Sequence, residues 1–140
     1  MKMNVMLSLQ GKQTYPGQEP ELIELVTDGT MEPVADGWVI SYAESSLTGL
    51  EGVTTTFHVQ DGCVTLTRTG KLQSQMVFKQ GVRHDSLYQM EFGALMMTVC
   101  ATHIQWKLSQ EGGTVDLKYL IEIEHSAAGT VDYHLIITPK

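Results

Sequence analysis

The stretch VTTTFHVQDGCVTLTRTG, residues 53–70, decides the fold class. Apolar residues alternate with threonine and other polar residues on both sides of Asp61-Gly62, which is the period of a β-strand with one buried face. An Asp-Gly pair between two such runs is the strongest short-range hairpin signal, because both central residues of a type I′ turn need positive φ. The stretch therefore predicts two antiparallel strands joined by a tight turn.

The same alternation recurs along the rest of the chain. We expect strands over residues 3–9, 21–27, 38–44, 53–59, 64–69, 72–78, 88–92, 94–110, 116–124 and 131–137. The second strand is expected to end at Asp28-Gly29, and residues 14–20, which contain two prolines, to connect it to the first. Residues 94–110 begin with Ala-Leu-Met-Met, as a helix would, but period two holds over most of the stretch. It therefore favours a strand with Cys100 on its apolar face, as a small core residue.

Short connections make sequential strands antiparallel neighbours, because parallel pairs need long crossovers. An open meander of this many strands would leave two exposed edges, which closure into a barrel removes. We therefore expect residues 1–140 to form one all-β domain, a single antiparallel closed or nearly closed β-barrel of eight to ten strands. A two-sheet sandwich is the alternative, since periodicity does not separate the two architectures.

The composition supports a strand-rich protein and excludes several partners. Thr, Val and Ile make up 34 of the 140 residues, and these β-branched types prefer strands. The formal net charge of −7 argues against nucleic acid or an anionic membrane surface as a partner, because both attract a cationic face. No apolar run reaches the roughly 20 residues that span a bilayer.

Two features of the sequence bear on its location in the cell. Residues 1–12 lack the cleavage site of a signal peptide. Cys63 and Cys100 match no metal or redox spacing. We therefore expect a cytoplasmic protein with reduced thiols.

Two charged residues, Glu44 and Arg68, break the alternation by falling in the apolar phase of their strands. Glu44 is in phase with Tyr42, and Arg68 is in phase with Leu66. A lone buried charge is very costly unless it is paired. We hypothesise that both charges point inward and form an ion pair, with the hydroxyl of Tyr42 or Tyr88 as a further partner. The alternative is that each lies at a strand end, where its side chain reaches water.

An inward arginine also suggests a ligand, because the planar guanidinium fork suits a carboxylate or a phosphate. We expect a small apolar or acidic molecule to bind inside the barrel, at a site formed by Arg68, Glu44, Tyr42, Tyr88 and His84. His84 shares the phase of Tyr88, which makes it the most enclosed histidine. An ion pair between Glu44 and Arg68 would compete with the ligand, because it would occupy the fork. The alternative function is a structural or protein-interaction barrel whose interior is filled by side chains.

The sequence contains no motif for a nucleophile, a P-loop, a dinucleotide or a metal ion. We therefore predict no cofactor, no metal and no catalytic residue. The remaining alternative is an enzyme in which Glu44 and His84 act as acid and base, although nothing in the sequence brings the two together. The pattern is compatible with a monomer and with a homodimer.

Several short motifs occur in an order and spacing that resemble a known family. They are Ser41-Tyr42-Ala43-Glu44, Gly49-Leu50-Glu51-Gly52, Thr54-Thr55-Thr56, Val64-x-Leu66-x-Arg68-x-Gly70, Met76-x-Phe78, the segment 88–93 and Leu117-x-Tyr119. Over residues 37–137 the chain resembles the YwiB-like family of small bacterial β-barrel proteins, while the first 35 residues match only as generic strands. The resemblance implies a calycin-like barrel, the class of lipocalins and fatty-acid-binding proteins, with no established activity. Ligand binding by analogy with calycins is an inference from the fold alone.

Overall fold

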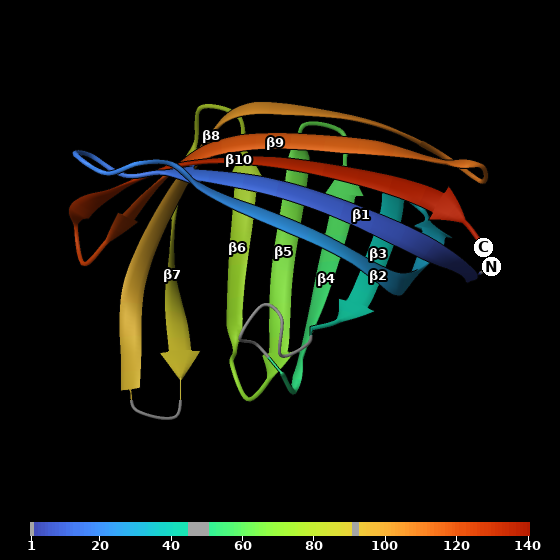
Figure 1. Ribbon diagram of the computed structural model, residues 1–140, viewed down its shortest axis with the longest axis horizontal. Helices are drawn as coiled ribbons and strands as arrows, with labels where there is room; N and C mark the ends of the chain where they lie inside the picture. Colours follow the sequence, from blue (N-terminus) through green and yellow to red (C-terminus); the bar gives the residue numbers. More distant parts are fainter. Residues whose placement is uncertain (1, 45–50, 91–92) are drawn as a thin grey trace.

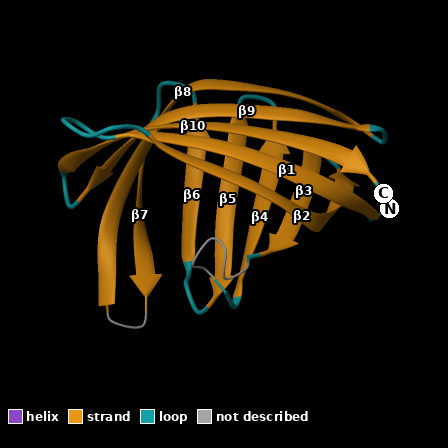
Figure 2. Ribbon diagram, in the orientation of Figure 1, coloured by secondary structure: helices purple, strands orange, loops and turns teal. Residues whose placement is uncertain are grey.

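One continuous sheet of ten antiparallel strands curls into a nearly closed barrel (Figure 1). The computed structural model describes residues 2–44, 51–90 and 93–140, without the side chains of Tyr88, Met90, Ala127 and Ala128. The strands are β1 (Met3–Thr14), β2 (Glu21–Val34), β3 (Gly37–Ala43), β4 (Val53–Gln60), β5 (Cys63–Gly70), β6 (Ser74–Lys79), β7 (Arg83–Met90), β8 (Gly93–Ser109), β9 (Gly112–Ile123) and β10 (Ser126–Pro139). Figure 2 shows strands joined by loops, with no helix among the described residues. The predicted all-β barrel is confirmed.

The strands follow the order β6-β5-β4-β3-β2-β1-β10-β9-β8-β7, so the first and last strands of the chain pair in the middle of the sheet. In Figure 1, strands β1, β2, β9 and β10 cross above β3, β4, β5 and β6. The inward side chains of the two sets meet in one core. On the lower strands it includes Ile40, Phe57, Val59, Val64, Leu66 and Phe78, and on the upper ones Val5, Leu7, Leu117 and Leu135.

The hairpin and the long strand read from the sequence are both present. The Asp61-Gly62 turn joins β4 to β5, with Gln60 opposite Cys63. Of its two central residues only Gly62 has positive φ, at 69°, so the turn is not of type I′. Residues 94–110 form nearly the whole of β8. Period two was therefore the stronger signal there, and the helix-like Ala-Leu-Met-Met start does not decide the conformation.

The predicted end of the second strand at Asp28-Gly29 is wrong, because β2 continues to Val34. Gly29 lies opposite Val5 within the β1–β2 ladder. A Cβ atom on Gly29 would stand 2.7 Å from both Leu7 Cδ1 and the Ser41 backbone oxygen. The glycine therefore allows a close approach inside the sheet and does not mark a turn.

The predicted core position of Cys100 is also wrong. The β8–β9 register shifts between Ala101 and His103. Ala101 is fully buried before this bulge, and Ile104 packs on the core after it, while Cys100 is only partly buried. An extra residue in one strand reverses the facing of everything on one side of it, so one parity does not hold across the whole strand.

Among the described residues, no helix is long and apolar enough to cross a membrane.

Candidate functional site

Four polar side chains form a row across neighbouring strands on the inner face of the barrel. Tyr42 of β3 lies opposite Thr55 of β4, Thr55 opposite Arg68 of β5, and Arg68 opposite Ser74 of β6. Tyr42, Thr55 and Ser74 are buried, and Arg68 is half-buried. The row arises because each residue falls in the inward phase of its own strand and the antiparallel register aligns the four positions.

Glu44 follows directly after β3 and joins this row from its end. Its side chain is 8% exposed, and the hydroxyl of Thr55 donates a hydrogen bond of 2.7 Å to its Oε2. Its backbone N–H donates to the carbonyl oxygen of Val53 at 2.8 Å. The chain thus holds a carboxylate inside the barrel with a buried donor on it. The direct ion pair between Glu44 and Arg68 stays a prediction.

The electrostatics place both charges close to the same two phenols. Burial is the main cause that raises the pKa of Tyr42; the neighbouring Tyr133 and Glu44 raise it further, whereas Arg68 lowers it. Burial also raises the pKa of Tyr133, against the field of Arg68 and a hydrogen bond with it. The two tyrosines therefore stay protonated and neutral at neutral pH, and they flank a carboxylate and a guanidinium.

A cavity of about 280 Å³ lies inside the barrel beside Arg68. Its polar lining comprises Arg68, Tyr119, Tyr133, Gln13, Tyr15 and Thr130, and its apolar lining comprises Met76, Leu95, Met97, Ile121, Ile123 and Val131. Leu95 is 36% exposed, so this wall reaches the surface. Arg68 lines the cavity and Glu44 does not. The guanidinium of Arg68, and not the carboxylate of Glu44, therefore forms part of the cavity wall.

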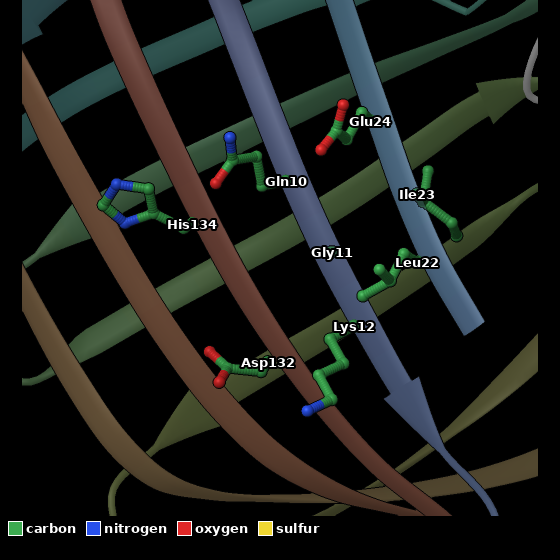
Figure 3. Close-up of a pocket in the computed structure, with 8 residues that line it drawn as sticks. All are labelled: Gln10, Gly11, Lys12, Leu22, Ile23, Glu24, Asp132 and His134. Carbon is green, nitrogen blue, oxygen red and sulfur yellow. The ribbon is translucent and has the colours of Figure 1, made fainter. Parts of the chain in front are cut away.

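A second hollow of about 220 Å³ lies on the outer face of the barrel, over β1, β2 and β10 (Figure 3). Its walls are mostly exposed side chains of the outward phase, including Gln10, Lys12 and Glu24. Two of its polar groups already have partners in the chain, since His134 contacts Asp116 and Asp132 lies 3.7 Å from Lys118. The internal cavity is the better candidate, because it encloses apolar surface together with a few convergent polar groups.

Comparison with known proteins assigns the chain to a family. A model described as "Domain of unknown function (DUF1934)" matches residues 7–135. The chain belongs to the DUF1934 family. Its structure is similar to that of the ywiB protein from Bacillus subtilis, with a TM-score of 0.90 and 22% sequence identity over 99% of this chain and 93% of that chain. The resemblance to the YwiB-like family is confirmed, and at this identity the likeness shows the fold alone.

No curated protein matches the chain. The function of this DUF1934 protein is therefore inferred from its own residues. The relation to calycins stays a prediction. Of the site residues predicted from sequence, Arg68, Glu44 and Tyr42 lie together at the polar row. The side chain of Tyr88 lies outside the described residues.

His84 takes a different place from the rest of the predicted site. Its Nδ1 atom lies 3.5 Å from the backbone N–H of Val77, between β7 and β6, and it does not line the cavity. Neither His84 nor Glu44 lines the cavity, which gives no support to the acid–base alternative. Among the described residues, no group of three or more His, Cys, Asp and Glu side chains is arranged to hold a metal ion.

The residues of the site that were not predicted from the sequence of this DUF1934 chain include Thr55, Tyr119 and Tyr133. Tyr119 and Tyr133 lie in the apolar phase of β9 and β10, and Thr55 lies in the buried phase of β4. A tyrosine in the inward phase carries a hydroxyl that needs a partner, and that signal was available. Thr55 was missed because it belongs to a run of three threonines. Only its alternation with Phe57 and Val59 shows that Thr55 points inward.

Proposed function

We propose that the barrel holds a small amphipathic molecule in its internal cavity, without catalysing a reaction on it. The apolar part of the molecule would lie against Met76, Met97 and Ile121, and its polar, acidic head would lie at Arg68. The observation that carries the proposal is the composition of the cavity wall, which combines one guanidinium and three phenols with apolar side chains.

The size of the cavity limits what can bind in it. Its volume is about 280 Å³, and its wall reaches the surface at Leu95, so water fills it when no ligand is bound. Ligand pockets typically begin at about 300 Å³, so the occupant is smaller than a drug-sized molecule.

The chemistry of the polar end favours a head that accepts hydrogen bonds. A guanidinium has donors and no acceptor, so in the hydrogen bond between Arg68 and Tyr133 the phenol oxygen accepts. Glu44 is outside the cavity wall and receives the hydroxyl of Thr55. The head would thus meet the guanidinium of Arg68 at the wall of the cavity, where the carboxylate does not line it.

Binding of octanoate and of octanol to the purified protein tests the proposal. Octanoate should bind more tightly than octanol, and Arg68→Met should weaken octanoate by about 10- to 100-fold, the value of one hydrogen bond to a charged group, while leaving octanol nearly unchanged. Arg83→Met is the matched control, because Arg83 is exposed and pairs with Glu122 at the surface. Titration calorimetry measures each affinity. An absence of binding by both probes, or equal effects of the two variants, would contradict the proposal.

A further inference from the structure

The barrel has one seam, between β6 and β7, the two strands at the ends of the sheet order. All other neighbouring strands are joined by ladders of consecutive residue pairs. Among the described residues, β6 and β7 are linked only by two isolated bridges at their ends: Gln73, just before β6, pairs with Gln89, and Lys79 pairs with Val82, just before β7. The two bridges lie at opposite ends of the seam, so its middle has no ladder.

Side chains take the place of the ladder in the middle of the seam. The backbone N–H of Val77 points to the imidazole of His84, at 3.5 Å, which is long for a hydrogen bond. The hydroxyls of Ser74 on β6 and Ser86 on β7 are buried and have no hydrogen-bond partner among the described residues. Buried polar groups normally find partners. The seam is therefore the least cohesive strand contact of the barrel.

The seam borders the internal cavity. Ser74 lies opposite Arg68 on the inner face, and Met76, the next inward residue of β6, lines the cavity. On the outer side, a groove of about 320 Å³ runs over the seam between Gln73, Gln75, Leu87 and Gln89, and Arg68 lines it as well. One residue thus forms part of the wall of both spaces.

We infer that the two strands β6 and β7 separate to let the ligand enter and leave, with Arg68 meeting the acidic head on the way. This inference rests on the proposed function. Of the hydrogen bonds across the middle and far end of the seam that the described residues form, opening breaks the Gln73–Gln89 pair and the Val77–His84 contact. The turn at Gln80 and Gly81 can stay in place, since the Gly81 N–H is bonded to the Ala101 carbonyl oxygen at 2.8 Å. Regions with few backbone bonds open locally at the lowest cost.

Amide hydrogen exchange of the unmodified sequence tests the opening without any ligand. The Val77 amide should exchange about a hundredfold faster than ladder-bonded amides of β4 and β5, because it depends on a local opening rather than on global unfolding. Equal protection of Val77 and of the β4–β5 amides would overturn the inference. This measurement needs no substitution, so it holds even where a variant fails to fold.

A disulfide across the seam tests the route. Gln73 and Gln89 exchange both backbone hydrogen bonds, at 3.0 and 2.9 Å, and both side chains are exposed. Such a pair has Cα atoms about 5.5 Å apart, which a disulfide spans. Gln73→Cys with Gln89→Cys, in a background of Cys63→Ser and Cys100→Ser, should oxidise to lock the seam. Thr54→Cys with Thr69→Cys, an exposed pair across β4 and β5, is the matched control.

The exchange rates of octanoate, measured by NMR line shapes, distinguish the outcomes. The oxidised seam lock should slow both association and dissociation by about tenfold or more with an unchanged affinity, and reduction should restore the rates. Unchanged rates in the locked protein would overturn the route and leave the proposed function standing. An absence of octanoate binding in the reduced protein would overturn both, and slow Val77 exchange would overturn the opening alone.

Discussion

Thr55 is the residue on which the polar row depends. Its side chain is completely buried, and its hydroxyl donates to Glu44. A buried carboxylate that loses a donor keeps the full cost of its removal from water. The hydroxyl of Thr55 is therefore expected to contribute substantially to the stability of the folded protein.

We predict that Thr55→Val destabilises the protein by about 1.5–3 kcal/mol, because the substitution keeps the shape of the side chain and removes a hydrogen bond to a charged group. Thr54→Val is the control: Thr54 is the neighbour on the exposed face of the same strand, where a change within about 0.5 kcal/mol is usual. Urea unfolding gives both values. A Thr55→Val midpoint equal to that of the control would show that Glu44 does not need this donor.

Single residues show how far the site could be read from the sequence. The alternation along a single strand was enough to predict that Glu44, Arg68 and Tyr42 point inward, because the neighbours of each residue in the sequence set its phase. The cavity wall was only partly predictable: the inward phase of Tyr119 and Tyr133 can be read from their strands, but their approach to Arg68 depends on the curl of the sheet. The position of His84 depends on the location of the seam between β6 and β7, and the local sequence does not predict where that seam lies.

At the scale of the strand, two irregularities separate the observed fold from the predicted one. The bulge between Ala101 and His103 shifts the inward phase of β8 for all residues after it, and β2 continues through Gly29, where a turn was predicted. Both depend on a neighbouring strand. A sequence that alternates predicts that a strand exists, but the register and the close approach are set by the partner strand.

We predict that Gly29→Ala destabilises the protein by about 1–3 kcal/mol, the cost of overpacking, because the new methyl group would stand 2.7 Å from Leu7 Cδ1 and from the Ser41 backbone oxygen. The matched control is Gly11→Ala on the adjacent strand β1, where the nearest atom would be Ile23 Cβ at 3.9 Å. Thermal unfolding followed by circular dichroism compares the two. Equal melting temperatures would mean that β1 and β3 move apart easily at this point.

At the scale of the whole molecule, three tyrosines make the barrel sensitive to alkali. Burial raises the pKa of Tyr42, Tyr119 and Tyr133 above the ordinary value of 10.0. Below about pH 10 the phenols are protonated in both the folded and the unfolded chain. At higher pH only the unfolded chain loses these protons. Stability then falls as the pH rises, because the unfolded state binds fewer protons.

We predict that the free energy of unfolding is nearly constant from about pH 8 to pH 10 with respect to these groups, and that above it each tyrosine removes up to about 1.4 kcal/mol per pH unit. Urea titrations at several alkaline pH values measure the slope, and tyrosinate absorbance should rise for these three residues only on unfolding. Tyr133→Phe should make the slope shallower. Ionisation of all five tyrosines near pH 10 in the folded protein would refute the prediction.

The pairing of β1 with β10 has a consequence for how the protein is made. Val5 lies opposite Pro139, and Thr14 lies opposite Thr130, so β1 is synthesised well before its partner strand β10. Until then β2 covers one edge of β1, and the other edge presents unpaired backbone groups, the kind of edge that recruits other chains. Contacts between residues so far apart in the sequence also form slowly. The barrel is therefore most prone to aggregation during its synthesis, when β1, which becomes a central strand, is still an edge strand.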